Sequence, residues 1–434
     1  MNKRHISGMG LGLLLAVSAC AQTREIEQAV DPTIVHAALE GKPEALHPHL
    51  AVALQQGPRN RVLNDMRLGL ALFSLGQDES AAEFFDNALT SIESVYADNP
   101  EAEKARGLFV RETNKDFKGE PYERAMAYYY RGLLYMRAGD YENAHASFTS
   151  GVLQDTLAEQ EHYQADFGLL ILLEGWANHC YDKTAESNDL YADFQKHNAD
   201  FPLPAEAHNT LILVETGWSP VKAHGKGKEA EERHALRFFP GGEAEIPRLS
   251  LPSEDGKTLD VTASAIEDVF FQASTRGGRT FDVILKGKAQ FKEASGAIGD
   301  ALLTAGVVTG TVAYTHDNQN AGYAALGMLM AGLVAKGVEA AVQDEADIRY
   351  WDNLPGKVFG HTAFLPKSVE SVDVTFLNAD RTANGRTQTV PVVTAGTCRL
   401  VWARSNPAVP FAPRAPFSAP EQVMSQPVAI PARK

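Results

Sequence analysis

Ser219 and Lys222 are one pair of residues whose spacing could support catalysis. They fit the pattern S-x-x-K, in which a serine at the start of a helix is the nucleophile and a lysine one turn later helps to activate it. Enzymes with this motif also need S-D-N and K-T-G elements, and neither is present in the sequence. We therefore interpret the pair as incidental.

Two histidine patterns could support metal or thiol chemistry. His47 and His49 are two positions apart beside a proline, but no acidic or thiol ligand stands at a familiar spacing from them, and H-E-x-x-H is absent. We predict a surface loop there. His179 and Cys180 are adjacent, and neighbours on a helix point about 100° apart. The sequence therefore predicts no catalytic residue, no metal, no cofactor and no enzyme.

A mixture of charges and aromatic rings at residues 347–352 is a better candidate for binding. Such mixtures are enriched at protein interfaces, so Arg349 and Trp351 are predicted to contact a partner. The alternative is that Trp351 packs over a sheet. In either case Arg349 can pair with Asp347 or Asp352.

The charge balance excludes one class of partner. Lysine and arginine number 40 against 55 aspartate and glutamate residues, which gives a formal net charge of -15. The only dense basic run is short, at residues 222–228. Binding to a phosphate backbone needs a basic face, so we predict no nucleic acid.

The first twenty residues have the order of an export signal. Lys3 and Arg4 form a basic start, and residues 8–17 are an apolar stretch too short to span a bilayer. The end of this segment, "VSAC", resembles the lipobox of bacterial lipoproteins, which implies cleavage before Cys20 and acylation of that cysteine. Because Ala21 is not the aspartate that favours retention at the inner membrane, we expect an outer-membrane anchor facing the periplasm. A plain secretory signal is the alternative.

Two further cysteines, Cys180 and Cys398, remain in the body of the chain. Disulfides form in exported proteins, so one bridge between the two halves is possible. We interpret the pair instead as two separate buried thiols.

The first half of the chain repeats one spacing of small and large residues. Phe85 follows Gly69 after sixteen positions, and Phe148 follows Gly132 after the same step. Small and apolar residues match at further steps of three, twelve and nineteen. This pattern resembles the tetratricopeptide repeat (TPR), in which a small residue lets two helices approach and an aromatic ring fills the space opposite. The resemblance covers about residues 64–155, and a third, repeat-like hairpin is predicted at 163–198.

Stacked repeats of this kind form a concave surface that receives a peptide or a partner's helix. Asn64, Arg67, Tyr128 and Arg131 lie on or beside the inward row of the first helices and are predicted to bind that partner. Tyr129 is expected to be partly exposed.

The second half changes to short segments rich in β-branched residues and bounded by proline, glycine or charge, which is typical of strands. Along residues 369–376 apolar and polar residues partly alternate, so one face of that strand is predicted to be buried and the other exposed to solvent. We predict antiparallel strands at 209–217, 235–239, 246–252, 257–263, 280–287, 357–366, 369–378, 386–393 and 397–404.

A glycine- and alanine-rich helical hairpin is predicted at residues 294–343, between the two groups of strands. It contains a GxxxG pattern that lets helices pack closely in lipid. Its first arm, residues 299–313, is shorter than the ~20 residues needed to span a bilayer. We interpret it as a buried hairpin against the sheet, with contact to a membrane or another copy as the alternative.

The sequence therefore predicts an α-helical domain at residues 21–202, then an α+β domain at 203–404. A proline- and alanine-rich tail follows at 405–434, where a proline every three to seven residues prevents a packed core.

The lipobox, residues 117–144 and residues 346–359 together resemble a family of bacterial lipoproteins with TPR-like N-terminal halves. The resemblance implies fold and location and carries no activity. We expect a lipid-anchored scaffold or adaptor that binds a protein partner in cell-envelope assembly or in regulation of a wall-synthesis or export complex. The alternatives are a membrane-inserting secretion or pore component that uses the glycine-rich hairpin, and an enzyme acting on cell-wall fragments.

Overall fold

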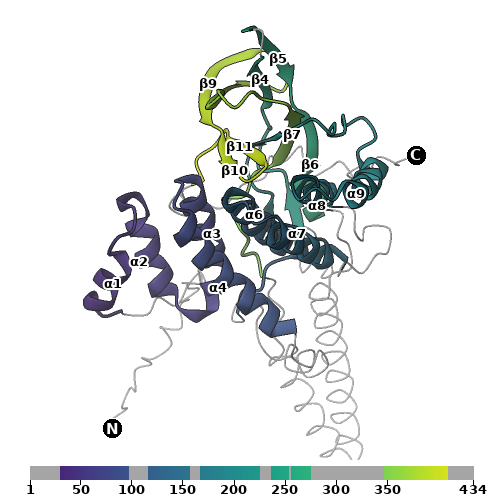
Figure 1. The fold of residues 1–434 in the computed structure, drawn as a ribbon. Helices are drawn as coiled ribbons and strands as arrows, with labels where there is room; N and C mark the ends of the chain where they lie inside the picture. Colours follow the sequence, from purple (N-terminus) through teal and green to yellow (C-terminus); the bar gives the residue numbers. More distant parts are fainter. Residues whose placement is uncertain are drawn as a thin grey trace, which may run out of the picture.

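The computed structural model describes residues 30–96, 116–156, 167–224, 236–253, 256–274 and 347–408. Within these ranges the chain forms three layers (Figure 1): helices, a five-stranded sheet, and a four-stranded sheet on the other side of the five-stranded one. The mixed α+β class predicted from the sequence is therefore confirmed.

Most of the helices pack in consecutive pairs joined by short turns, and the pairs are α3 with α4, α6 with α7, and α8 with α9. Gly76 follows α3 and Gly139 ends α6, with φ of 71° and 74°, a left-handed conformation that favours glycine. The helices are α1 (Pro32–Leu39), α2 (His47–Gln56), α3 (Arg61–Ser74), α4 (Asp78–Tyr96), α6 (Pro121–Ala138), α7 (Tyr141–Thr156), α8 (Gly168–Cys180), α9 (Thr184–His197) and α11 (Val269–Ser274), with 3-10 turns at Glu44–Leu46 and Pro58–Asn60.

The predicted contact between a glycine and an aromatic ring is confirmed in the helical layer. A Cβ atom added to Gly69 would lie 3.1 Å from the Phe85 ring, and one added to Gly132 would overlap the ring of Phe148. The third pair follows the same rule, because a Cβ on Gly175 would lie 2.6 Å from the Tyr191 ring. In each hairpin the glycine lets the second helix approach closely enough for the ring to pack on its backbone.

The strands form two larger sheets and a two-stranded one. The five-stranded sheet has the order β10-β11-β1-β7-β6, the four-stranded sheet has the order β5-β4-β8-β9, and β2 pairs with β3. The strands are β1 (Thr210–Thr216), β2 (Val221–His224), β3 (Leu236–Phe239), β4 (Ile246–Pro252), β5 (Thr258–Thr262), β6 (Ser264–Asp268), β7 (Lys357–Ala363), β8 (Ser371–Leu377), β9 (Ala383–Pro391), β10 (Val393–Ala395) and β11 (Cys398–Arg404).

Strand direction is antiparallel throughout the four-stranded sheet, as predicted. In the five-stranded sheet, however, β1 runs parallel to β11, so the prediction of antiparallel strands is wrong for that pair. Periodicity alone carries no information about direction, and these two strands lie far apart along the chain.

The five-stranded sheet is buried on both faces. Leu211 and Leu213 of β1 pack in the core that the sheet shares with the helices, whereas Ile212 and Val214 pack in the core between the two sheets. All seven residues of β1 are buried, which explains the unbroken apolar run at residues 211–214. The helical layer and the five-stranded sheet therefore share one hydrophobic core across the predicted boundary at residue 203.

Cys180 and Cys398 form a disulfide, so our interpretation of two separate thiols is wrong. Cys180 ends α8 and Cys398 begins β11, and 218 residues separate them along the chain. The fold brings these two element ends together because the side chain of Cys398 lies on the face of the five-stranded sheet that packs against the helices. The disulfide links the helical layer to the sheet covalently.

Several predicted features lie outside the described residues: Cys20, the glycine-rich segment 294–343, the strand at 280–287 and residues 409–434. At the start of the predicted tail, Ala408 is buried and its carbonyl accepts a hydrogen bond from Asn353 Nδ2 at 2.6 Å. No helix in the described ranges is long and apolar enough to cross a membrane.

Candidate functional site

The predicted binding residues on α3 contact the protein's own chain. Arg67 Nε donates to Asp352 Oδ1 at 2.7 Å, and the Arg67 carbonyl accepts a hydrogen bond from Asn353 Nδ2 at 3.1 Å. Asn64 Nδ2 donates to Gln56 Oε1 at 2.8 Å. The structure therefore brings Arg67 together with the predicted binding segment at 347–352, whereas Asn64 contacts Gln56 and Arg67. Asp352 and Asn353 thus contact Arg67 on the side of α3 that was predicted to face a partner.

Trp351 is fully buried, so the prediction that it contacts a partner is wrong. Its ring packs near Phe85 and Tyr130, with centroid distances of 6.3 and 5.9 Å. A tryptophan buries a large apolar area, and here it joins the segment after residue 346 to the helical core. The packing alternative was the correct one, although the surface that Trp351 covers is made by helices rather than by a sheet.

Arg349 is held by groups at the start of α3. Its guanidinium pairs with Asp347 Oδ2 at 2.7 Å and donates to Asn60 Oδ1 at 2.6 Å. The predicted pairing with Asp347 is confirmed, and Asp352 pairs with Arg67 instead. The side chain of Arg349 is largely buried, so its contacts serve the attachment of this segment to α3.

Tyr128 and Arg131 lie on a different surface, at the contact between α4 and α6. Tyr128 Oη donates to Glu93 Oε1 at 2.6 Å, and Arg131 Nε donates to Asp86 Oδ1 at 2.6 Å. Nearly two turns further along α6, Arg137 pairs with Asp78 at 2.7 Å. We call these three pairs the α4/α6 seam, which comprises Asp78, Asp86, Glu93, Tyr128, Arg131 and Arg137.

Exposure differs along the α4/α6 seam. Tyr128 is buried, whereas the side chain of Asp86 is 55% exposed and Arg131 is partly exposed above the ring of Tyr135, 3.8 Å from its centroid. The prediction that Tyr128 binds a partner directly is therefore wrong, because its hydroxyl is engaged with Glu93. The side chain of Arg131 is 14% exposed and pairs with the exposed carboxylate of Asp86.

A buried carboxylate that sequence analysis missed organises the contact between the helices and the sheet. Glu215 of β1 accepts hydrogen bonds from four side chains on α6 and β11, and burial raises the pKa of its carboxyl while Arg404 opposes that shift. The donors are Tyr129 Oη at 3.1 Å, Tyr130 Oη at 2.9 Å, Trp402 Nε1 at 2.9 Å and Arg404 Nη1 at 2.9 Å.

We call these five residues the Glu215 cluster. Tyr129 is fully buried within it, contrary to the prediction that this side chain is partly exposed. Burial raises the pKa of both tyrosine hydroxyls, so they stay protonated and donate to the carboxylate. The one signal in the sequence was a glutamate directly after the apolar run at residues 211–214 of a predicted strand. Such a group is stable in a core only when it is fully hydrogen-bonded.

A second buried polar group joins α6 to the loop before β7 and to β2. Glu123 accepts hydrogen bonds from the backbone N–H groups of Trp351 and Glu120, each at 2.6 Å. Glu120 pairs with Lys222 at 2.6 Å, and both of these side chains are buried. Ser219 Oγ donates to the Trp351 carbonyl at 2.8 Å. Ser219 and Lys222 therefore serve this junction, and Lys222 stands on a strand rather than on the helix that the catalytic motif requires.

Burial raises the pKa of Glu123 to about 7, with Lys222 opposing the shift and Glu120 adding to it. Because the folded state holds this proton more tightly than the unfolded state, the contribution to stability is complete at acidic pH and is lost as the pH rises through about 7. We expect Glu123→Gln to remove up to about 3 kcal/mol of the pH dependence of unfolding between about pH 5 and pH 8.

Urea unfolding of both proteins at the two pH values measures this difference. Glu174 and Asp65 also have raised pKa values, about 7 and about 6, but they are present in both proteins and cancel in the comparison. Equal changes in unfolding free energy for the wild type and Glu123→Gln would show that the buried carboxyl does not titrate in this range.

The histidines have structural partners. His47 begins α2 and its Nε2 hydrogen-bonds with the Lys42 carbonyl at 3.0 Å, so the predicted loop at His47 and His49 is a helix. His179 stacks on Trp176 with a centroid distance of 4.7 Å, and its neighbour Cys180 is in the disulfide. Among the residues that the structure describes, no group of three or more histidine, cysteine, aspartate or glutamate side chains could hold a metal ion.

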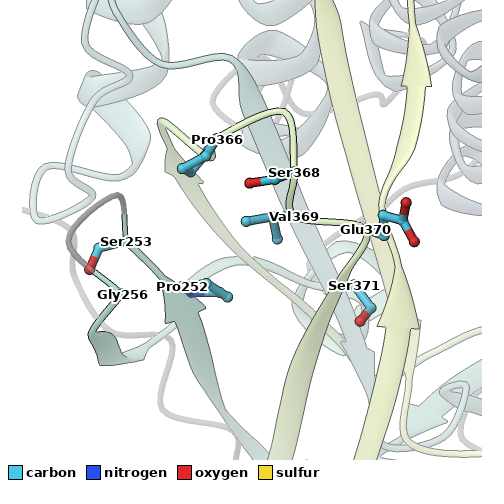
Figure 2. A pocket seen from close by; sticks show the side chains of 8 residues that line it. All are labelled: Pro252, Ser253, Gly256, Pro366, Ser368, Val369, Glu370 and Ser371. Atoms are coloured by element: carbon cyan, nitrogen blue, oxygen red, sulfur yellow. The ribbon is translucent and has the colours of Figure 1, made fainter.

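An open hollow of about 530 Å³ lies at one end of the four-stranded sheet, between the β4–β5 turn and the loop before β8 (Figure 2). Arg399 of β11 stabilises the loop before β8, because its guanidinium donates to the Pro366 carbonyl at 2.9 Å. The hollow is lined by Pro252, Ser253, Gly256, Pro366, Ser368, Val369, Glu370 and Ser371. The serine hydroxyls and the Glu370 carboxylate in this lining can form hydrogen bonds.

Comparisons with protein-family models, curated proteins and solved structures give no significant match to this chain. Inference about function therefore depends on the residues described above. Of the predicted binding residues, Arg67, Arg349 and Trp351 attach residues 347–353 to the helical layer, and Asn64 contacts Arg67. Tyr128 and Arg131 lie on the α4/α6 seam.

Proposed function

We propose that this chain is a lipid-anchored scaffold or adaptor of the bacterial outer membrane, facing the periplasm, that binds a protein partner in cell-envelope assembly or in control of a wall-synthesis or export complex. The observation that carries the proposal is the disulfide between Cys180 and Cys398. Structural disulfides persist in oxidising compartments such as the periplasm and are rare in the cytosol. The Cys180–Cys398 disulfide therefore supports the interpretation of the first twenty residues as an export signal ending at Cys20.

The helical hairpins support the TPR-like part of the proposal. Three glycine and aromatic pairs recur at the same step of sixteen residues, and in each pair the ring packs on the glycine. Repeats of this kind bind partners through the side chains that a stack of helices exposes. Because Asp352 and Asn353 already contact Arg67 on α3, we place the partner on the α4/α6 seam, where the side chain of Asp86 is 55% exposed and Arg131 lies beside it.

Photocrosslinking in the native host tests this assignment. A photoreactive residue at Asp86 is expected to capture a discrete protein, whereas the same residue at Asp193 on α9 is expected to capture none. The two sites are matched, because their carboxylates are 55% and 56% exposed and each pairs with a basic side chain. Arg131→Glu should weaken capture from Asp86 about tenfold, since arginine is a frequent hot-spot residue, and Lys196→Glu should leave it unchanged.

The anchor is tested separately in the same cells. The wild-type protein should partition into detergent with an acylated Cys20, and Cys20→Ser should move to the aqueous phase, because two or more acyl chains are needed for a stable anchor. Crosslinks from Asp86 to lipid or to the chain itself alone would contradict the scaffold assignment. A wild-type protein in the aqueous phase would contradict the anchor and leave the partner assignment to be judged by the crosslinks.

A further inference from the structure

The four-stranded sheet has an edge strand that stays unpaired among the described residues. β5 is the first strand in the order β5-β4-β8-β9, and its five residues are exposed or half-buried. An unpaired edge presents a row of N–H and C=O groups that another strand can join. The opposite edge strand, β9, packs against β11 and is partly covered.

The hydrogen bonds at the two ends of the β4–β5 pair determine which backbone groups point outward. Ala263 N donates to the Pro247 carbonyl at 3.0 Å, and Ser253 N donates to the Lys257 carbonyl at 2.9 Å. In an antiparallel pair such residues alternate with residues whose backbone groups point away from the partner. The N–H and C=O groups of Thr258, Asp260 and Thr262 therefore point away from β4.

The side chains of β5 present two chemistries to an incoming strand. Leu259 is 60% exposed and stands on the same face as Val261, which packs against the core between the sheets. Asp260 stands on the opposite face, where Ser250 Oγ donates to its Oδ1 at 2.7 Å. An additional strand would thus cover Leu259 with an apolar residue and place a residue directly opposite the Asp260 carboxylate.

We propose that β5 accepts an added strand from another protein, and that this strand carries a basic residue between two apolar residues. The basic residue pairs with Asp260, and the apolar residues extend the inter-sheet core over Leu259. Cross-strand ionic and apolar pairs are the interactions that select a strand at a sheet edge. This proposal does not depend on the α4/α6 seam or on the lipid anchor.

Charge excludes the simplest alternative occupant. A second copy of β5, paired about a two-fold axis so that all five residues match, would place Asp260 directly opposite its own equivalent. Like charges in directly opposite positions destabilise a pair of strands. The proline-rich residues 405–434 are unsuitable as well, because each proline lacks the N–H group that a sheet ladder needs.

A charge-swap experiment tests the proposal on the full-length protein. The probes are two labelled ten-residue synthetic peptides that differ at one position, with either lysine or glutamate between two leucines. Fluorescence anisotropy should show the lysine peptide binding about tenfold more tightly than the glutamate peptide. Asp260→Lys should reverse this preference, whereas Asp193→Lys, an equal charge change on α9, should preserve it.

Amide hydrogen exchange resolved to single residues identifies the mode of binding. The N–H groups of Thr258, Asp260 and Thr262 should become protected when the lysine peptide binds, because they then donate to the added strand. Binding without this protection, or a preference that Asp260→Lys fails to reverse, would overturn the proposal. The absence of binding by either peptide at about millimolar concentration, the weak end of specific association, would also overturn it.

Discussion

Replacing both Cys180 and Cys398 with alanine is expected to lower the free energy of unfolding by about 2–5 kcal/mol. The disulfide closes a loop of more than two hundred residues, and constraint of the unfolded chain grows with loop length. Both cysteines are buried, so alanine fits each site without introducing a polar group. Equilibrium unfolding in urea, with the slope fitted separately for each protein because loss of the bridge expands the unfolded chain, measures the difference.

Reduction supplies the matched control for the disulfide. Dithiothreitol should lower the stability of the wild-type protein to about that of the double variant, and it should leave the double variant unchanged. Labelling of both thiols in denatured, unreduced wild-type protein would contradict the bridge itself. Equal stability of the oxidised wild type and the double variant would contradict the expected contribution.

Glu215→Ala is expected to destabilise the protein by about 3–5 kcal/mol, comparable to the loss of the disulfide. The change leaves the guanidinium of Arg404 buried without its carboxylate and removes the acceptor for Tyr129, Tyr130 and Trp402. An uncompensated charge and unsatisfied donors in a core carry most of this cost. Thermal or urea unfolding, with circular dichroism as the signal, measures it.

Two further variants separate the buried charge from a general effect of losing a carboxylate. Asp86→Ala removes an exposed carboxylate that also pairs with an arginine, and it should cost less than about 1 kcal/mol. Adding Arg404→Met to Glu215→Leu should recover part of the lost stability, because the unpaired charge is then gone. If Glu215→Ala and Asp86→Ala have similar effects, the Glu215 cluster does not hold the layers together.

Local patterns in the sequence were sufficient for most of the elements and for contacts inside one hairpin. The step of sixteen residues from Gly132 to Phe148 predicted two helices and the contact between them. The partial alternation of residues 369–376 predicted a strand with one buried face, and β8 (Ser371–Leu377) is that strand. Such predictions succeed because the period of a helix or strand and the turn between neighbours depend on nearby residues.

The candidate binding residues were harder to interpret, because their environment depends on distant parts of the chain. Trp351 has the composition of an interface residue, and its neighbours in the fold turn out to be Phe85 and Tyr130, which no local pattern links to it. Arg67 was predicted to face a partner, and the group that it meets is Asp352 of the same chain. The sequence showed that these side chains make ionic and aromatic contacts. It did not show that the contacting residues belong to the same chain rather than to a partner.

The sequence by itself determined the helical hairpins, most of the described strands and the α+β class, since these depend on periodicity and on turns read over a few residues. It did not predict the short strands β2, β6 and β10. Only the tertiary structure decided that Cys180 reaches Cys398, that Glu215 receives donors from α6 and β11, and that β5 is left at an edge. Each of these facts depends on contacts between segments far apart in the chain. Such contacts form because apolar faces on different elements are buried together, and that arrangement follows from the packing of all the layers at once.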